Sequence, residues 1–427
     1  MQDLNGAAFP ERKDMRRLRE NDQNTETQCE RIDPGHANYR IPIEYKGGEK
    51  MKKMVKAASL VATAAMAASL AACGGSAAQT TTAAATTAAA AESKAEESKA
   101  DAAESKADGA VDLSGVDANY KLELKLSHVF APDEALTKNM QAIADSIKEK
   151  SNGMVDIQCF PQSQLPVYQD GVAQVVAGAN FISVEDPSYL GDYVADFNVL
   201  AGPMLVTSYD QFGALLETDE VKDMFKKAEE KGIKILNMDY IFGFRSMMTN
   251  KVIKTPEDLK GMKIRTPKSE LYVNTLNAMG ATATPMGFAD TIAAVQQGVV
   301  DGLEGTIDAY GSNGSAEVAK KMALTKHLLG VCGAYINPNV FNGMPEPLQK
   351  LVQDEFDAGA KNMVKQVSEN EEAQKKNLSE KYGIEFNDVD VDAFKATLAP
   401  IYKEMETKKG TTPGLYDKFQ EYIKDVK

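Results

Sequence analysis

Apolar residues from position 119 onward switch repeatedly between a period of two and a period near 3.6. Leu122, Leu124 and Leu126 alternate with polar residues, as in a strand with one buried face, and this strand ends at His128. Residues 134–150 then carry apolar side chains at helical spacing until Ser-Asn-Gly stops the pattern. Such alternation of strand and helix is typical of an α/β domain.

The same pattern gives the other elements of this first unit. It predicts strands over residues 154–160, 180–184 and 234–240, and helices over residues 169–177 and 219–231. Ligands of open α/β sheets bind beyond the carboxyl ends of the strands. We therefore expect a site near His128, Glu185 and the loop that ends at Tyr168.

A second α/β unit begins near Gly243. Residues 255–261, Thr-Pro-Glu-Asp-Leu-Lys-Gly, combine an N-cap residue, a proline at the first helical position, an acidic first turn and a closing glycine, so they predict a short helix. Further strands are expected over residues 262–266 and 302–306, and further helices over residues 269–279 and 289–297.

Residues 345–382 form one long predicted helix with Gly359 as its single internal glycine. At about 1.5 Å per residue this helix would be roughly 57 Å long. Because that exceeds the diameter of one small domain, we expect the helix to span both units.

The N-terminal part of the chain contains the pattern of a secretion signal. A basic segment at 52–56 precedes the uncharged, alanine-rich residues 57–72, and Leu-Ala-Ala precedes Cys73. This order is typical of a secretory signal peptide over residues 51–72, and the Leu-Ala-Ala-Cys sequence resembles a bacterial lipobox. We expect Cys73 to carry a lipid anchor; the alternative is an ordinary cleaved signal. A membrane-spanning helix is the weaker interpretation, because residues 57–72 barely span an apolar layer of ~30 Å.

The segments on either side of this signal have no apolar periodicity. Residues 1–50 precede a signal peptide, where such a signal could not work, so we expect Met51 to be the true start and residues 1–50 to be translated leader sequence. The alternative is a natural disordered extension. Residues 73–118 are rich in Ala, Thr, Ser, Glu and Lys, which favours a solvated tether after the cysteine.

Composition excludes several classes of protein. The 427 residues include 48 Lys and Arg against 62 Asp and Glu, a net charge of −14, which disfavours nucleic-acid binding. His36, His128 and His327 lie far apart without neighbouring ligands, so we expect no metal and no cofactor. Cys159 and Cys332 follow the signal, and the sequence leaves open whether they pair.

The sequence contains no GxSxG, GxxxxGK[ST] or HExxH motif, so we expect no enzymatic activity. Two alternatives stay open. The first is an extracytoplasmic α/β enzyme, and the second is a ligand-presenting subunit of a sensor system.

Several ordered motifs resemble one known family. They are Gly-Phe-Arg at 243–245, Thr-Pro-Glu-Asp-Leu-Lys-Gly-Met-Lys-Ile-Arg-Thr-Pro at 255–267, Thr-Pro-Met-Gly-Phe at 284–288 and Gln-Gly-Val-Val-Asp-Gly at 297–302. Phe-Pro-Gln-Ser-Gln-Leu at 160–165 fits the same pattern. Over residues 120–425 the chain resembles the solute-binding proteins of tripartite ATP-independent periplasmic (TRAP) transporters, the C4-dicarboxylate type.

The resemblance implies an α/β, two-domain fold of the periplasmic-binding-protein (type II-like) kind, with a cleft and a long helix across both domains. It places domain I at 119–242 plus about 331–370, and domain II at 243–330 plus about 371–427. The implied function is to bind an organic acid anion outside the cytoplasm and to deliver it to TRAP membrane subunits driven by an ion gradient. We expect a monomer.

The resemblance also implies ligand contacts. Arg265, in Lys-Ile-Arg-Thr-Pro, is expected to clamp a carboxylate through two parallel donors. Arg245 is a second expected contact, and Phe288 is the aromatic that lines the family's cleft. Glu185 is expected to hold Arg245 or to accept a hydroxyl of the ligand. His128 is an expected polar contact at the end of the first strand.

The remaining expected site residues are Tyr168, Lys268 and Gly305. Gly305 stands where relatives with sugar-acid ligands carry an asparagine, and Ser188 stands where some carry an arginine. Since neither residue supplies the donor found there in those relatives, we expect a monocarboxylate or a hydroxy or keto acid in preference to sialic acid.

Overall fold

The computed structural model describes residues 111–426. In this part of the chain nine strands form one sheet in the order β2-β1-β3-β8-β4-β7-β5-β6, with β9 paired to β8. The strands are β1 (Leu122–Ser127), β2 (Val155–Phe160), β3 (Phe181–Glu185), β4 (Lys234–Thr249), β5 (Lys263–Thr266), β6 (Thr282–Pro285), β7 (Gly302–Gly305), β8 (Lys321–Ile336) and β9 (Glu385–Asn387).

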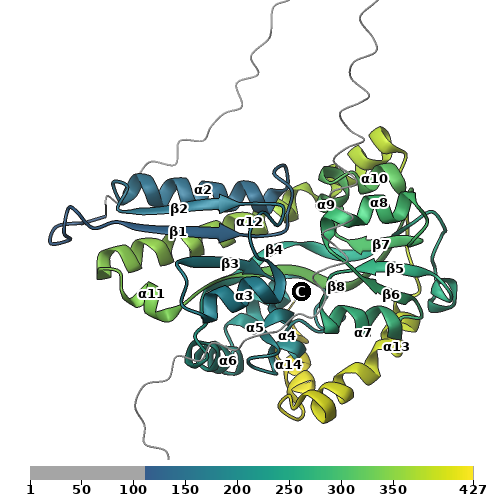
Figure 1. Ribbon diagram of the computed structural model, residues 1–427. Coiled ribbons are helices and arrows are strands. Elements are labelled where there is room, and N and C mark those ends of the chain that lie inside the picture. Colours follow the sequence, from purple (N-terminus) through teal and green to yellow (C-terminus); the bar gives the residue numbers. More distant parts are fainter. Residues whose placement is uncertain (1–110, 427) are drawn as a thin grey trace, which may run out of the picture. The chain divides into compact units, whose positions relative to one another are not determined.

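The sheet has two parallel ends and an antiparallel middle. Strand β1 pairs in parallel with β2 and β3, and β5 pairs in parallel with β6 and β7. The two 16-residue strands β4 and β8 are antiparallel to each other and to their outer neighbours β7 and β3. They join the end with β1–β3, here called the first half, to the end with β5–β7, the second half (Figure 1).

Helices pack on both ends of this sheet (Figure 1). They are α2 (Ala135–Lys150), α3 (Tyr168–Val176), α4 (Phe197–Leu200), α5 (Tyr209–Leu216), α6 (Asp219–Glu230), α7 (Glu270–Ala278), α8 (Thr291–Gln296), α9 (Ile307–Ser312), α10 (Ser315–Val318), α11 (Pro338–Asn342), α12 (Glu346–Tyr382), α13 (Val391–Glu404) and α14 (Leu415–Ile423). Short 3-10 turns are η1 (Pro187–Leu190), η2 (Pro256–Leu259) and η3 (Phe288–Asp290), and η4 (Met405–Lys409) is a π turn.

Most of the predicted strands and helices are confirmed. Helix α2 buries the predicted Met140, Ile143 and Ile147. Helix α6 is capped by Thr218, whose hydroxyl accepts from the backbone N–H of Val221, next to an acidic first turn. The predicted helix at 255–261 is only a 3-10 turn. The strand predicted to end at residue 240 continues to residue 249, and β8 was not predicted at all.

Helix α12, with 37 residues, confirms the long helix that the sequence predicts. It packs against β4, against α2 of the first half and against α9 of the second half. Gly359 allows the close approach to α2, because a Cβ there would lie 2.3 Å from Cδ1 of Ile143.

Packing begins before the predicted start of the globular part. Val111, Leu113 and Val116 pack against the core of the first half.

The predicted leader, signal peptide and lipidated Cys73 lie outside the described residues. Among residues 111–426, no helix is long and apolar enough to cross a membrane. Cys159 and Cys332 are both free thiols.

Candidate functional site

A cavity of about 60 Å³, here called the inner cavity, is lined by residues from both halves. The lining residues are Val129, Phe130, Glu134, Tyr168, Phe242, Arg245, Arg265, Pro267, Phe288, Glu304, Gly305, Ala309, Tyr310 and Asn313. The first four come from the loop after β1 and from the start of α3. The others come from β4, β5, β7 and the segments that follow β5, β6 and β7.

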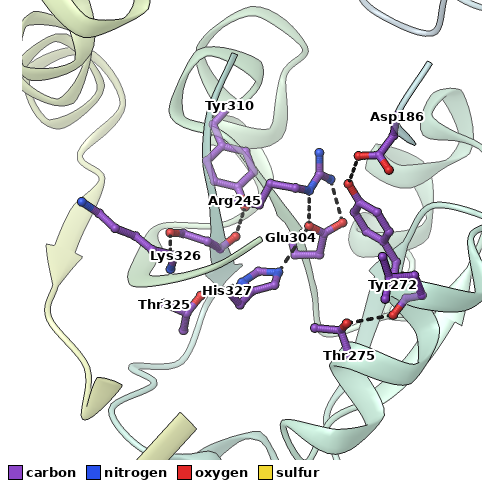
Figure 2. Close-up of polar contacts among 11 residues, drawn as sticks. Asp186, Arg245, Tyr272, Thr275, Glu304, Tyr310, Thr325, Lys326 and His327 are labelled. Carbon is purple, nitrogen blue, oxygen red and sulfur yellow. Dashed lines mark hydrogen bonds and ion pairs between the residues drawn. The ribbon is translucent and has the colours of Figure 1, made fainter. Parts of the chain in front are cut away.

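Arg245 and Glu304 form a buried ion pair in the wall of the inner cavity (Figure 2). Arg245 Nε donates to Glu304 Oε2 at 2.6 Å and Nη2 donates to Oε1 at 2.8 Å, a two-bond geometry. The pair forms because β4 and β7 are adjacent antiparallel strands. Arg245 is therefore neutralised within the protein.

His327 of β8 lies next to the Glu304 carboxylate of this pair. Its Nε2 lies 3.5 Å from Glu304 Oε2, and its Nδ1 lies 2.8 Å from the hydroxyl of Thr325. Burial raises the pKa of the Glu304 carboxyl, but Arg245 and His327 outweigh burial and hold that pKa at about 2. Glu304 is consequently ionised at any physiological pH.

Three hydrogen bonds connect the two halves next to this network. Tyr272 of α7 donates its hydroxyl to Asp186 Oδ2 at 2.6 Å, and its ring lies 5.1 Å from the guanidinium carbon of Arg245. The hydroxyls of Ser188 and Ser269 lie 3.0 Å apart. The side chain of Gln169 donates to the backbone oxygen of Lys268 at 2.8 Å. The described structure thus has its halves in contact beside the inner cavity.

Arg265 on β5 differs from Arg245 in having no carboxylate partner within residues 111–426. It is 1% exposed, its Nη2 donates to the backbone oxygen of Met286 at 2.9 Å, and its Nε has no partner among the described residues. Its guanidinium carbon lies 5.2 Å from the centre of the Phe288 ring. Burial lowers the pKa of Arg265, since the charged form loses its hydration.

Glu134 is the second carboxyl group of the inner cavity. It precedes α2, is 2% exposed, and its Oε1 accepts from the backbone N–H of Ala131 at 2.8 Å. Burial raises the pKa of Glu134 to about 8, so the group is mostly protonated at pH 7. With Glu134 neutral and Arg245 paired to Glu304, the lining has one uncompensated positive charge, on Arg265.

Five of the residues expected from the sequence line the inner cavity: Arg265, Arg245, Phe288, Gly305 and Tyr168. A Cβ on Gly305 would lie 3.4 Å from the ring of Tyr310, so the aromatic ring occupies the wall beside this glycine. The hydroxyl of Tyr310 is held by the backbone oxygen of Ser246 at 2.8 Å.

The other three expected residues are outside the inner cavity. His128 is fully buried, both ring nitrogens lack partners among the described residues, and burial lowers its pKa to about 4. Glu185 is buried behind Tyr168, where its Oε1 accepts from the Tyr168 backbone N–H at 2.7 Å. The carboxylate that pairs with Arg245 is Glu304 and not the expected Glu185. Lys268 is exposed.

A larger cavity of about 390 Å³, here called the outer cavity, shares Val129, Phe288 and Asn313 with the inner cavity. Its complete lining is Val129, Ala131, Gln162, Ser163, Phe288, Ala289, Ile292, Ser312 and Asn313. None of these residues is charged. The charged groups of the site therefore all belong to the inner cavity.

A third cavity of about 320 Å³ lies beside η1, α7 and the end of α13. Two of its lysines, Lys408 and Lys409, pair with Glu404 and Glu270. Because these charges cancel within the protein, this cavity is a weaker candidate for an anion site.

The sequence did not indicate Glu134, Glu304, Tyr310 or Asn313 as site residues. Glu304 is 59 residues from Arg245, so no local spacing connects the two. The one sequence feature that indicates Glu304 as a buried functional residue is its charge within the otherwise apolar strand Gly302–Gly305.

Comparison with known proteins gives one family. A family model described as bacterial extracellular solute-binding protein, family 7, matches residues 126–409. A solved TRAP periplasmic solute binding protein from Desulfovibrio salexigens, in complex with diglycerolphosphate, is 54% identical, with a TM-score of 0.69 over 71% of this chain and 97% of that chain. Another, from Fusobacterium nucleatum with bound sn-glycerol-3-phosphate, is 38% identical, with a TM-score of 0.69 over 71% of this chain and 98% of that one. The C4-dicarboxylate-binding periplasmic protein of Rhodobacter capsulatus is 27% identical over 67% of this chain and 87% of its own length.

Proposed function

Because this chain belongs to the bacterial extracellular solute-binding proteins of family 7, the TRAP type, we propose that it holds a small organic anion on Arg265 and delivers it to an ion-gradient-driven permease. Members of this family are substrate-binding proteins and not enzymes. The family's periplasmic-binding-protein-like fold has two domains, and the domain boundaries expected from the sequence remain part of this proposal.

The unpaired charge of Arg265 is the observation that carries this proposal. A buried cation without a counter-ion is costly, since its hydration is lost and nothing replaces it. An anion in the inner cavity would supply the missing partner and would meet the free Nε of Arg265. Phe288, against the face of the guanidinium, limits the directions in which Arg265 can turn.

We propose a phosphate ester of glycerol as the ligand class. Two solved relatives, 54% and 38% identical to this chain, hold diglycerolphosphate and sn-glycerol-3-phosphate. An arginine binds a phosphate oxygen pair as well as it binds a carboxylate, so Arg265 suits both kinds of anion. The competing ligand is the carboxylate expected from the sequence, a monocarboxylate or a hydroxy or keto acid.

A thermal-shift panel on residues 111–427 separates these two classes. The panel contains sn-glycerol-3-phosphate, diglycerolphosphate, L-galactonate, D-glucuronate, short dicarboxylates and sialic acid. A ligand at 100 times its dissociation constant stabilises the native state by about 2.7 kcal/mol, which a melting curve resolves easily. We expect the largest shift with a glycerol phosphate. A larger shift with any carboxylate would reject the phosphate ester and support the carboxylate clamp.

We further propose that the chain acts as a monomer outside the cytoplasm, anchored by a lipid on Cys73 and beginning at Met51. The support is the basic segment, the alanine-rich stretch and Leu-Ala-Ala-Cys in the printed sequence. Mass spectrometry of the protein extracted from its host membranes should find an acylated N-terminal Cys73. Any peptide from residues 1–72 in the mature protein would contradict both the cleavage site and the anchor.

A further inference from the structure

The inner and outer cavities divide the site by charge. Arg245, Arg265, Glu134 and Glu304 all line the inner cavity. The outer cavity is lined by uncharged residues, several of them with hydroxyl or amide groups. Val129, Phe288 and Asn313 belong to both linings, so the two cavities are adjacent and one ligand that occupied both would pass these residues. Such a ligand would have an anionic part and an uncharged polar part.

Asn313 supplies a free hydrogen-bond donor where the two cavities meet. Its Oδ1 accepts from the backbone N–H of Ser315 at 2.9 Å and from the Ser315 hydroxyl at 2.6 Å. These two bonds fix the orientation of the Asn313 amide, so its Nδ2 is the atom that remains available to a ligand. That nitrogen is buried and has no partner among the described residues. A buried amide without an acceptor costs free energy, which an oxygen atom of a ligand would recover.

A turn at Gln162 and Ser163 forms another part of the outer-cavity lining. Gln162 and Ser163 have φ angles of 54° and 59°, in the left-handed region that side chains other than glycine rarely adopt. Their backbone N–H groups donate to the carbonyls of Phe130 at 3.0 Å and His128 at 3.1 Å. The turn thereby places two exposed polar side chains, those of Gln162 and Ser163, at the outer cavity.

The charge of the inner cavity also discriminates between a phosphate monoester and a diester. The lining leaves one positive charge uncompensated at pH 7, on Arg265. A phosphate monoester carries about −1.5 to −2 charges at this pH, whereas a phosphodiester carries a single negative charge. The diester is therefore the better electrostatic match, and it has a second arm that extends beyond the phosphate.

From these observations we propose that the outer cavity is a second ligand subsite that takes the uncharged, hydroxylated arm of a glycerol phosphodiester, with Asn313 as the residue that selects for this arm. The assignment rests on the proposed function, since it assumes that the phosphate lies on Arg265.

The first experiment uses the unaltered protein and three ligands in isothermal titration. They are diglycerolphosphate, glycerol methyl phosphate, which has the same charge but no hydroxyls on its second arm, and sn-glycerol-3-phosphate. We expect diglycerolphosphate to bind roughly three- to tenfold more tightly than the methyl diester, the effect of one or two net hydrogen bonds. Equal affinity for the two diesters would overturn the second subsite alone. Failure of all three to bind would overturn the proposed phosphate ligand and this subsite together.

The second experiment replaces the selecting residue. Asn313→Leu removes the free donor, so the preference for diglycerolphosphate over the methyl diester should disappear. Asn313→Asp keeps the acceptor for Ser315 and serves if the leucine variant does not fold; it should reduce the same preference. Asn370→Leu, at an exposed position of α12, is the matched control and should leave the preference unchanged. A preference that survives both Asn313 variants would overturn the role of Asn313.

Discussion

The two arginines of the inner cavity have different electrostatic surroundings. Arg245 donates from Nε and Nη2 to the Glu304 carboxylate, so its charge is already balanced. Arg265 donates to the backbone oxygen of Met286, but its Nε has no partner and no carboxylate pairs with it among the described residues. An incoming anion therefore gains most from Arg265, whereas Arg245 mainly shapes the wall and holds Glu304.

Substitution of Arg265 by lysine tests this difference. Arg265→Lys should weaken anion binding by about 1.5–3 kcal/mol, because one ammonium cannot present two parallel donors. The melting temperature of the free protein should change little, since Arg265 has no ion pair to lose within residues 111–426 and a lysine can still donate to the backbone oxygen of Met286. Lys263→Met, at an exposed position of the same strand, is the control and should bind as the unaltered protein does. Titration calorimetry showing equal affinity for the Arg265 variant would remove this residue from the site.

Glu304 should matter for stability more than for ligand contact. Glu304→Gln leaves Arg245 buried without a counter-charge, so the free energy of unfolding should fall by about 3–5 kcal/mol. Glu385→Gln breaks a comparable pair with Lys321, but that carboxylate is largely exposed and should cost less than about 1 kcal/mol. Denaturant titration measures both losses. Similar losses for the two variants would mean that burial does not govern the Arg245–Glu304 pair.

Glu185 should make the protein less stable at high pH. Burial raises the pKa of Glu185 from 4.5 to about 8, so the folded state binds its proton more tightly than the unfolded state. Stability from this group is complete below pH 4.5 and is lost as the pH rises toward 8, at about 1.4 kcal/mol per unit of pKa difference. Glu185→Gln should flatten the curve of unfolding free energy against pH between these values. Parallel curves for the two proteins would show that Glu185 is ionised in the fold.

Sequence motifs predicted part of the lining of the inner cavity, and the other lining residues could not be predicted because their partners are distant in the sequence. Arg265 and Phe288 lie in short motifs that resemble one family, and Gly305 stands where some relatives carry an asparagine, so these positions could be predicted. The partner of Arg245 could not, because strand pairing brings Glu304 to it from 59 residues away. Asn313 was missed for a similar reason, since its free donor follows from its bonds to Ser315 and not from any motif.

At the scale of elements, hydrophobic periodicity predicted strands and helices correctly where one face of the element is buried. The alternating strand at 122–126 and the helix at 134–150 are of this kind. Strand β8 lies in the middle of the sheet and buries residues on both faces, so its sequence has no period of two. The predicted strand at 234–240 covers only the first part of β4 for the same reason. The second part of β4, through Gly243 and Arg245, is continuously apolar or buried.

The close approach of β4 and β8 gives a test at this scale. A Cβ on Gly330 would lie 2.6 Å from the backbone oxygen of Gly243, which cannot turn away as a side chain could. Gly330→Ala should lower the free energy of unfolding by about 1–3 kcal/mol. Gly213→Ala, in α5 with nothing within 4 Å of the new Cβ, is the matched control and should raise stability by up to about 1 kcal/mol. Equal effects would contradict the crowding between the two long strands.

At the scale of the molecule, hydrogen bonds join the two halves beside the inner cavity. Tyr272 with Asp186, and Ser188 with Ser269, join the segments that follow β3 and β5. Contacts of this kind favour a closed arrangement whenever a ligand adds its own contacts to both halves. Since β4, β8 and α12 are shared, bending of these three elements is the motion that could separate the halves.

Ligand binding should therefore compact residues 111–427. Small-angle scattering should give a smaller radius of gyration with saturating ligand, while the far-ultraviolet circular dichroism stays constant. Tyr272→Phe removes one bond between the halves and should weaken binding by roughly three- to tenfold without touching the ligand. An unchanged radius with a ligand proven to bind would indicate a rigid site.

The position of β8 in the sheet also determines when the chain can fold during its synthesis. Ile182 of β3 pairs with Ile336 of β8, 336 − 182 = 154 residues later. A ribosome that adds about 5–20 residues per second needs roughly 8–30 s to make that stretch. Until then the first half lacks the strand that joins it to β4, and its apolar faces have no complete sheet to cover them. Factors that bind unfolded polypeptide, such as chaperones and export machinery, have this interval in which to act.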